Sequence, residues 1–245
     1  MCLYFQQVIL GQEFEVKTYN LHIEQPEEGY RYSVDSVLLA EFASLKARAR
    51  VLELGAGCGV ISLILGRRFP ACNIHAVEIQ DELFRFLGKN IETHGLSQRI
   101  FPVHHDIRQI RRLFPAGSFE HVVTNPPFRP PVSGRLCLDA QEALARHEIL
   151  IDLEGIIDAA AWVLKPGGRF SIIYPAERLS FLLGSMTKKR IEPKRLRCVH
   201  PSEKRQARMV LVEGVRDAGI ELRIEPPLFL NSRDKSGLAI LEDRC

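Results

Sequence analysis

The stretch "VLELGAGCGV" (51–60) decides the fold, because it runs an apolar strand directly into three alternate glycines. The overlapping "GVISLILGRRF" (59–69) is apolar at helical spacing, and Pro70 follows it. Glycine tolerates positive φ and lets the backbone approach a ligand closely. We therefore predict a strand, a tight turn and a helix, with a ligand at the turn; a turn needed only for packing is the alternative.

The same strand-to-helix alternation continues along the chain and indicates a parallel sheet with helices on both faces. We predict a seven-stranded, mostly parallel, doubly wound (Rossmann-like) α/β sheet with a C-terminal β-hairpin and a short N-terminal extension. The expected strands are 50–55, 73–79, 100–107, 121–125 and 169–175, with the hairpin at 195–201 and 207–215. The expected helices are 33–45, 59–69, 81–95, 154–164 and 177–189.

The composition is that of an ordinary globular protein, with 245 residues, 46% hydrophobic content and a net charge of +3. The six cysteines include no C-x-x-C pair, so we expect unpaired thiols and no metal site. The start, "MCLYFQQVIL", lacks the basic and apolar regions of a signal peptide. Apolar runs stay far below the ~18 residues of a membrane span. A cytoplasmic protein without a membrane partner is the expectation.

Three acidic residues are predicted at the edge of the sheet where the glycine turn lies. Glu53 precedes the glycines, Glu78 ends the second strand, and Asp106 lies near the end of the third. Ligands of open α/β sheets bind at the carboxyl ends of the strands, where a carboxylate can accept hydrogen bonds from ribose hydroxyls. The spacing G-x-G-x-G, without a following lysine, disfavours a P-loop and the usual dinucleotide fingerprint.

The fourth strand ends in "HVVTNPPF" (121–128). Pro126 and Pro127 fix the backbone and donate no hydrogen bond, so acceptors remain: the Asn125 amide oxygen and the backbone carbonyls. Phe128 adds a flat apolar face. Such a set suits a planar –NH₂ or –CONH₂ group, whose nitrogen becomes positive as it attacks. A proline-rich loop that merely ends a strand is the alternative.

The segments "VLELGAGCGVISL", "AVEI" (76–79) and "HHDI" (104–107) resemble the class I S-adenosylmethionine-dependent methyltransferases. The resemblance implies that the glycine turn and the acid before it hold the methionine part of the donor, that the second acid holds the ribose, and that the third reaches the adenine amino group. These residues are Gly55, Gly57, Gly59, Glu53, Glu78 and Asp106. "NPPF" resembles the signature of methyltransferases that act on adenine N6, guanine N2 or glutamine N5, and it implies catalytic roles for Asn125, Pro126, Pro127 and Phe128.

Positive charge is concentrated in one segment. Residues 188–208 carry nine lysines and arginines against two acidic residues, although the whole chain has a net charge of only +3. If the sixth strand is parallel, the loop "HPSEKRQAR" (200–208) lies at the edge that carries the glycine turn. A basic loop there indicates phosphate binding, so Lys204, Arg205 and Arg208 are candidate contacts for RNA. A solvated basic face is the alternative.

Further segments occur in an order similar to the bacterial tRNA1(Val) (adenine-37-N6)-methyltransferase family: "GYRYSVDSVLLAEFA" (29–43), "NPPF", "LKPGGRFSIIYPAERL" (164–179), "KRQARMVLVEGV" (204–215) and "EPPLFL" (225–230). The resemblance implies N6 methylation of an adenine in tRNA. It also implies that residues 1–45 form an extension that caps the donor, with Tyr32 and Asp35 near it, while 46–245 form the methyltransferase domain. Capping the predicted helix 33–45 is an equally good role for Asp35. Protein-glutamine N5 and guanine N2 methylation stay open.

Overall fold

A single large sheet organises the chain. The computed structural model describes residues 13–16, 19–26, 34–127 and 153–230. The strands of the sheet are β3 (Arg50–Leu54), β4 (Asn73–Glu78), β5 (Ile100–His104), β6 (Phe119–Thr124), β7 (Leu164–Pro175), β8 (Ile191–His200), β9 (Met209–Arg216), β10 (Arg223–Ile224) and β11 (Leu228–Phe229). Their order is β10-β8-β9-β7-β6-β3-β4-β5, and β11 also pairs with β8. The predicted mixed, mostly parallel sheet is confirmed.

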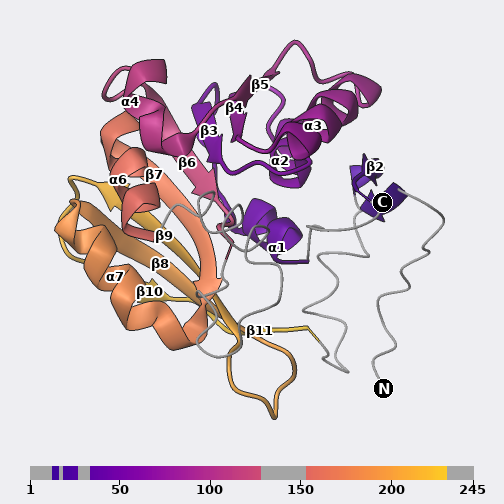
Figure 1. Cartoon of the computed structure of the whole chain (residues 1–245). Helices are drawn as coiled ribbons and strands as arrows, with labels where there is room; N and C mark the ends of the chain where they lie inside the picture. Colours follow the sequence, from indigo (N-terminus) through magenta and orange to yellow (C-terminus); the bar gives the residue numbers. More distant parts are fainter. Residues whose placement is uncertain (1–12, 17–18, 27–33, 128–152, 231–245) are drawn as a thin grey trace, which may run out of the picture.

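Helices cover both faces of this sheet (Figure 1). One layer contains α1 (Val34–Phe42), α2 (Val60–Arg68) and α3 (Asp81–Thr93), which share one apolar core. The other contains α4 (Ile110–Leu113), α6 (Leu153–Val163) and α7 (Leu179–Lys188), which share a second core. The doubly wound arrangement is therefore confirmed. No helix in the described ranges is both long and apolar enough to cross a membrane.

The topology fixes where a ligand can bind. β3 pairs in parallel with β4 on one side and with β6 on the other. The chain thus builds β4 and β5 outward from β3, and then returns to place β6 and β7 on the opposite side. Open α/β sheets bind ligands at the carboxyl ends of the strands where this reversal occurs. The ends of β3 and β6 therefore mark the expected site.

The C-terminal part of the sheet is larger than expected. The β8–β9 hairpin is confirmed, but β10 and β11 pair with β8, so this hairpin is not outermost. β9 is antiparallel to both β7 and β8, which gives β7 and β8 the same direction. β7 begins at Leu164 rather than at residue 169, because Leu164 already pairs with Phe119 of β6.

The N-terminal extension contains two short strands. β1 (Glu13–Val16) and β2 (Leu21–Glu24) form a separate antiparallel pair. Leu21 and Ile23 of β2 are fully buried in the core shared with α1, α2 and α3. The described part of the extension is therefore packed against the domain.

An ion-pair network around the buried Glu213 crosses the β7–β9 half of the sheet and consists of Arg169, Ser171, Arg195, Glu213 and Glu225. The fully buried Glu213 carboxylate accepts hydrogen bonds from Arg169, from the Ser171 hydroxyl (3.3 Å) and from Arg195 (3.4 Å). Arg195 also pairs with Glu225 at 2.7 Å. Because each carboxylate has cationic partners, the cost of burying these charges is offset.

Candidate active site

The glycine turn leaves β3 as the sequence predicted. Gly55, Gly57 and Gly59 have φ values of +74°, +57° and +94°, a region that L side chains rarely adopt. A Cβ atom on Gly59 would lie 2.6 Å from Leu87 Cδ1 of α3, whereas one on Gly55 would meet nothing within 4 Å. Gly59 therefore permits helix packing, and Gly55 opens onto free space where a ligand can approach the backbone.

Glu53 lies beneath this turn with its side chain almost wholly buried. Its Oε2 atom accepts hydrogen bonds from the backbone N–H of Ser62 (3.0 Å) and from the Ser62 hydroxyl. Burial raises the pKa of Glu53 to about 8, although both bonds from Ser62 act in the opposite direction. The carboxyl group is therefore mostly protonated at neutral pH, and a nearby cation would favour its ionised form.

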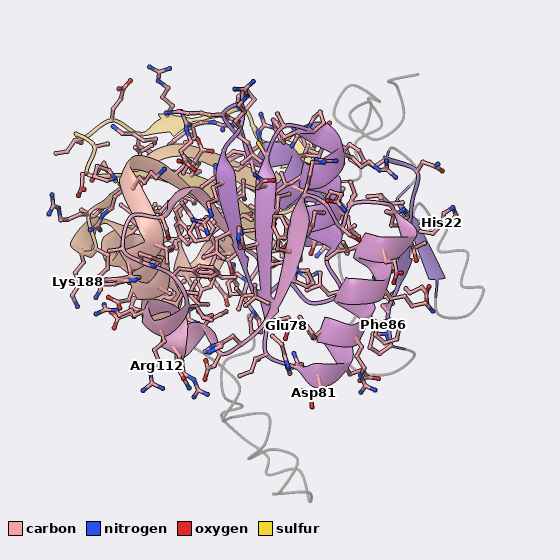
Figure 2. The ribbon with its side chains drawn as sticks, turned by 90° about the horizontal axis from the view of Figure 1, so that it is seen from above. His22, Glu78, Asp81, Phe86, Arg112 and Lys188 are labelled. Atoms are coloured by element: carbon pink, nitrogen blue, oxygen red, sulfur yellow. The ribbon has the colours of Figure 1, made fainter. Side chains whose placement is uncertain are left out.

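Glu78, the last residue of β4, connects that strand to the turn. Its Oε2 atom accepts from the Gly57 backbone N–H at 2.8 Å. Its Oε1 atom accepts from the backbone N–H groups of Ile79 (2.9 Å) and Gln80 (2.8 Å). In Figure 2, Glu78 lies at the strand ends, close to Asp81 at the start of α3. A carboxylate has about four lone-pair sites, so capacity for a hydroxyl donor remains.

Asp106 follows β5 and caps the short 3₁₀ helix η2 (Ile107–Gln109). Its carboxylate accepts from the Arg108 backbone at 2.8 Å and pairs with the Arg108 guanidinium at 2.7 Å. Partial burial alone would raise the pKa of Asp106, but the bonds from Arg108 outweigh it and lower the pKa. Asp106 is thus ionised, and its carboxylate already has a cationic partner.

Asn125 directly follows β6 and carries an unpaired acceptor. Its side-chain nitrogen donates to the Ser36 hydroxyl of α1 at 3.0 Å. Its Oδ1 atom is buried and has no hydrogen-bond partner within the described part of the chain, although the residue is only 8% exposed. A buried acceptor left unpaired costs about 1–3 kcal/mol, so such an atom calls for a ligand or another explanation.

Three other buried polar atoms also lack a hydrogen-bond partner in these ranges: His75 Nδ1, Arg197 Nε and Glu225 Oε2. The last two belong to an ion pair, since Arg197 Nη2 lies 2.8 Å from Glu225 Oε2. His75 packs among phenylalanine rings, and burial lowers its pKa to about 4. None of these three lies at the carboxyl ends of β3 and β6. Asn125 Oδ1 is therefore distinguished by both its position and its lack of a partner.

A small pocket joins Asn125 to the glycine turn. It encloses about 250 Å³, including the part open to solvent, and is lined by Ser36, Glu53, Gly55, Ala56, Gly57, Cys58, Val60, Ile61 and Asn125. Four of the predicted site residues thus meet at one cavity. Gly59 is part of the turn and Glu78 accepts a hydrogen bond from it, but neither residue lines the pocket. Asp106 lies at the same edge of the sheet and does not line the pocket either. Pro126 is buried and Pro127 is exposed beside Asn125.

The remaining predicted residues have different outcomes. Asp35 lies in the first turn of α1 and does not line the pocket, whereas its neighbour Ser36 does. Tyr32 and Phe128 lie outside the described residues, as does the C-terminal tail 231–245.

Three residues that position the site were missed in the sequence: Ser36, Ser62 and Asn90. Asn90 of α3 donates to the Cys58 carbonyl (2.9 Å) and to the Glu24 carbonyl (2.8 Å), and accepts from the Glu24 N–H (2.9 Å). It therefore ties β2 to the glycine turn. The available signal was its position, since a polar amide falls on the buried face of α3 with Leu83, Leu87 and Ile91.

Eight of the nine basic residues in the segment 188–208 divide into two groups, and the ninth, Lys194, donates to the Gly219 carbonyl. Near and within β8, Lys188, Lys189, Arg190, Arg195 and Arg197 all form ion pairs with acidic residues. In the loop after β8, Lys204, Arg205 and Arg208 are exposed, and no ion pair found within the described ranges involves them. Since β8 runs in the direction of β7, this loop lies at the edge that carries the pocket. Arg208 is held there by backbone bonds to Val199 and Ala176.

The comparisons with known proteins agree with this geometry. The family model described as "Methyltransferase small domain" matches residues 33–180. A tRNA1(Val) (adenine(37)-N6)-methyltransferase of Tolumonas auensis is 30% identical over 68% of this chain and 68% of its own length. The protein of the same name from Dyadobacter fermentans is 26% identical over 86% of this chain and 87% of its own length.

Two solved structures share the fold. A predicted O-methyltransferase from Agrobacterium tumefaciens superimposes with a TM-score of 0.68 at 18% identity, over 85% of this chain and 95% of its own. The geranyl diphosphate C-methyltransferase of Streptomyces coelicolor gives 0.55 at 13% identity, over 74% of each chain. At these identities the likeness concerns the fold alone, whereas the family model covers more than half of the sequence. The chain therefore belongs to the methyltransferase small domain family.

Proposed function

We propose that this protein transfers the methyl group of S-adenosylmethionine to N6 of an adenine in tRNA. The observation that carries the proposal is the buried Oδ1 atom of Asn125, which has no hydrogen-bond partner among the described residues and lies in a pocket shared with the glycine turn. An acceptor in that place fits an amino group presented to a methyl donor. The relatives named as tRNA adenine-N6 methyltransferases support adenine as the base that carries it.

The pocket residues suit the methionine end of the donor. Gly55 leaves space beside the backbone, and Glu53 offers a carboxyl group whose ionised form a cation would stabilise. We assign Glu78 to the ribose hydroxyls and Asp106 to the adenine amino group, because they lie at the ends of the next two strands. S-adenosylmethionine supplies a methyl group on a positively charged sulfur. The product that remains after transfer is S-adenosylhomocysteine.

The acceptor side depends on Asn125. The amino group of adenine is a weak nucleophile because its lone pair is conjugated with the ring. When its nitrogen bonds to the methyl carbon, the carbon–sulfur bond breaks and positive charge moves onto nitrogen. A fixed acceptor at the N–H group stabilises that charge, and the extra proton then leaves to water. We place Pro126 and Pro127 as the rigid support of Asn125, and Phe128 as the surface on which the extruded base stacks.

The outer parts of the site follow from the same proposal. Residues 1–45 would cover the donor, with Tyr32 and Asp35 close to it, and Asn90 supports this by tying β2 to the glycine turn. Lys204, Arg205 and Arg208 would bind tRNA phosphates, because they are exposed and lack acidic partners in the described ranges. A tRNA substrate places the protein in the cytoplasm.

The test is to identify the methylated product. The protein is incubated with S-adenosylmethionine tritiated at the methyl group, hypomethylated tRNA and a protein extract, and the tRNA is digested to nucleosides. We expect label in N6-methyladenosine, and none when Asn125→Ala replaces the wild-type protein. Label in N2-methylguanosine would refute the choice of base. Label confined to protein glutamine would refute RNA as the substrate.

A further inference from the structure

An exposed aromatic ring lies next to the carboxyl edge of the sheet. Phe181, in the first turn of α7, is 45% exposed. The 3₁₀ helix η3 (Ala176–Arg178) connects the end of β7 to α7, so Phe181 lies close to the edge where β6 and β7 end. The described residues expose only one other large aromatic side chain, Phe101 of β5.

Arg178 lies near two aromatic rings at this position. Its guanidinium carbon is 5.6 Å from the centre of the Phe181 ring and 5.7 Å from that of Tyr174. Arg178 is exposed, and no ion pair in the parts of the chain that the structure describes includes it. The contact with two rings orients a flat cationic group beside a flat apolar one, with both accessible to a partner.

The ring and the basic loop are adjacent. The Ala176 backbone N–H donates to the Arg208 carbonyl at 3.0 Å, so the start of η3 is joined to the end of the loop that carries Lys204 and Arg205. β7 also pairs directly with β6, the strand that leads to Asn125. Adjacent strands lie about 4.8 Å apart, so a chain leaving the pocket reaches this surface within a few nucleotides.

We propose that Arg178 and Phe181 form a stacking platform for an unpaired base that flanks the target nucleotide of the RNA substrate. The proposal rests on the proposed function and extends its substrate surface beyond the phosphate contacts. Single-stranded RNA is the partner that uses an aromatic face, a guanidinium plane and neighbouring cations together. An acidic peptide would use the cations but has no need of the ring.

The experiment measures RNA binding by the full-length protein. The probe is a fluorescein-labelled RNA hairpin with an adenine in its loop, and the duplex of its stem serves as comparison. Phe181→Ala should weaken binding of the hairpin roughly 5- to 100-fold without affecting the duplex. Because the ring has no charge, the slope of log K against log salt should stay unchanged. Phe181→Tyr should restore most of the affinity, and Phe101→Ala is the matched control for loss of an exposed ring.

The outcomes separate the two proposals. Donor binding and methyl transfer to the same hairpin are measured on the wild-type protein in parallel. If that protein methylates the hairpin and Phe181→Ala binds it as well as Phe101→Ala does, the platform is refuted and the function stands. If the wild-type protein neither binds nor methylates RNA, both proposals are refuted. Equal losses of affinity for hairpin and duplex would also refute the platform, since paired bases cannot stack on it.

Discussion

The ion-pair network around Glu213 and the pocket around Asn125 contain buried polar groups in opposite states. In the network, Glu213 has three hydrogen-bonding partners and Arg195 has a second carboxylate. In the pocket, Asn125 Oδ1 has none within the described residues. The basic side chains divide in the same way between β8 and the loop after it. Buried polar groups that pair with one another stabilise the fold. Buried polar groups without a partner, at the strand ends where the strand order reverses, are available to a ligand.

The largest effect is expected from breaking the network. Glu213→Ala removes the carboxylate shared by the half-buried Arg169 and Arg195, although Arg195 keeps Glu225, so the free energy of unfolding should fall by about 2–3 kcal/mol. Urea denaturation followed by circular dichroism measures it. Glu221→Ala removes a carboxylate from an exposed pair with Arg223 and should cause no measurable change. A Glu213 variant as stable as that control would mean that the network contributes nothing.

The titration of Glu53 provides a second test of the contrast. Its pKa is about 8 in the folded protein against 4.5 ordinarily, so its contribution to stability is lost as pH rises from 4.5 to 8. Two histidines act in the opposite sense, chiefly below their ordinary pKa of 6.5, because burial lowers the pKa of His121 to about 3 and that of His75 to about 4. Between pH 6.5 and 8, stability should therefore fall by about 1 kcal/mol, and Glu53→Gln should abolish that fall. A slope that Glu53→Gln leaves unchanged would contradict this assignment.

Ser36 is expected to orient the Asn125 amide. Because the Ser36 hydroxyl accepts a hydrogen bond from the amide nitrogen of Asn125, the amide oxygen faces the pocket. Ser36→Ala should lower kcat for methyl transfer about tenfold, since a freed amide presents its nitrogen part of the time. Ser36→Thr retains the hydroxyl and should restore the rate. Donor affinity, measured by calorimetry, should change little; if it falls in parallel with kcat, Ser36 acts on the donor instead.

The smallest effect concerns the loop after β8. Replacing Lys204, Arg205 and Arg208 together with alanine should reduce the slope of log K against log salt for RNA binding by about 2. The matched control replaces Lys188 and Arg223, which already pair with Glu154 and Glu221. The control should leave the slope nearly unchanged. Equal slopes for both variants would mean that the loop is an ordinary solvated surface and makes no contact with RNA phosphates.

Local patterns in the sequence were sufficient to predict the sheet, the glycine turn and the edge of the sheet at which the pocket lies. Alternate glycines after an apolar strand predict the turn below the pocket, and strand ends in a parallel sheet meet at one edge. That rule brought Glu53, Gly55, Gly57 and Asn125 to one cavity from positions up to 72 residues apart. The prediction succeeded because the topology of the sheet determines which strand ends are neighbours.

Residues that orient the site could not be found in this way. Ser36 contacts Asn125 across 89 positions, and Asn90 reaches Glu24 across 66. Their types, a serine in a helix and an amide on an apolar face, acquire a role only after α1 and α3 are packed. The pairing of the basic residues near and within β8 is similar, because their acidic partners come from α6, β9 and the segment after β9. Tertiary packing, rather than local pattern, decides which charges remain available.

The most direct test is to measure methyl transfer, donor binding and stability together for Asn125→Ala. The account predicts a 10²- to 10³-fold loss of transfer, by analogy with removal of a single group that stabilises transition-state charge. Donor affinity should persist, and the free energy of unfolding should fall by no more than about 1 kcal/mol, because the lost hydrogen bond to Ser36 is offset by removal of an oxygen that has no partner among the described residues. Normal transfer combined with a large loss of stability would show that Asn125 serves the fold, and would contradict the central claim.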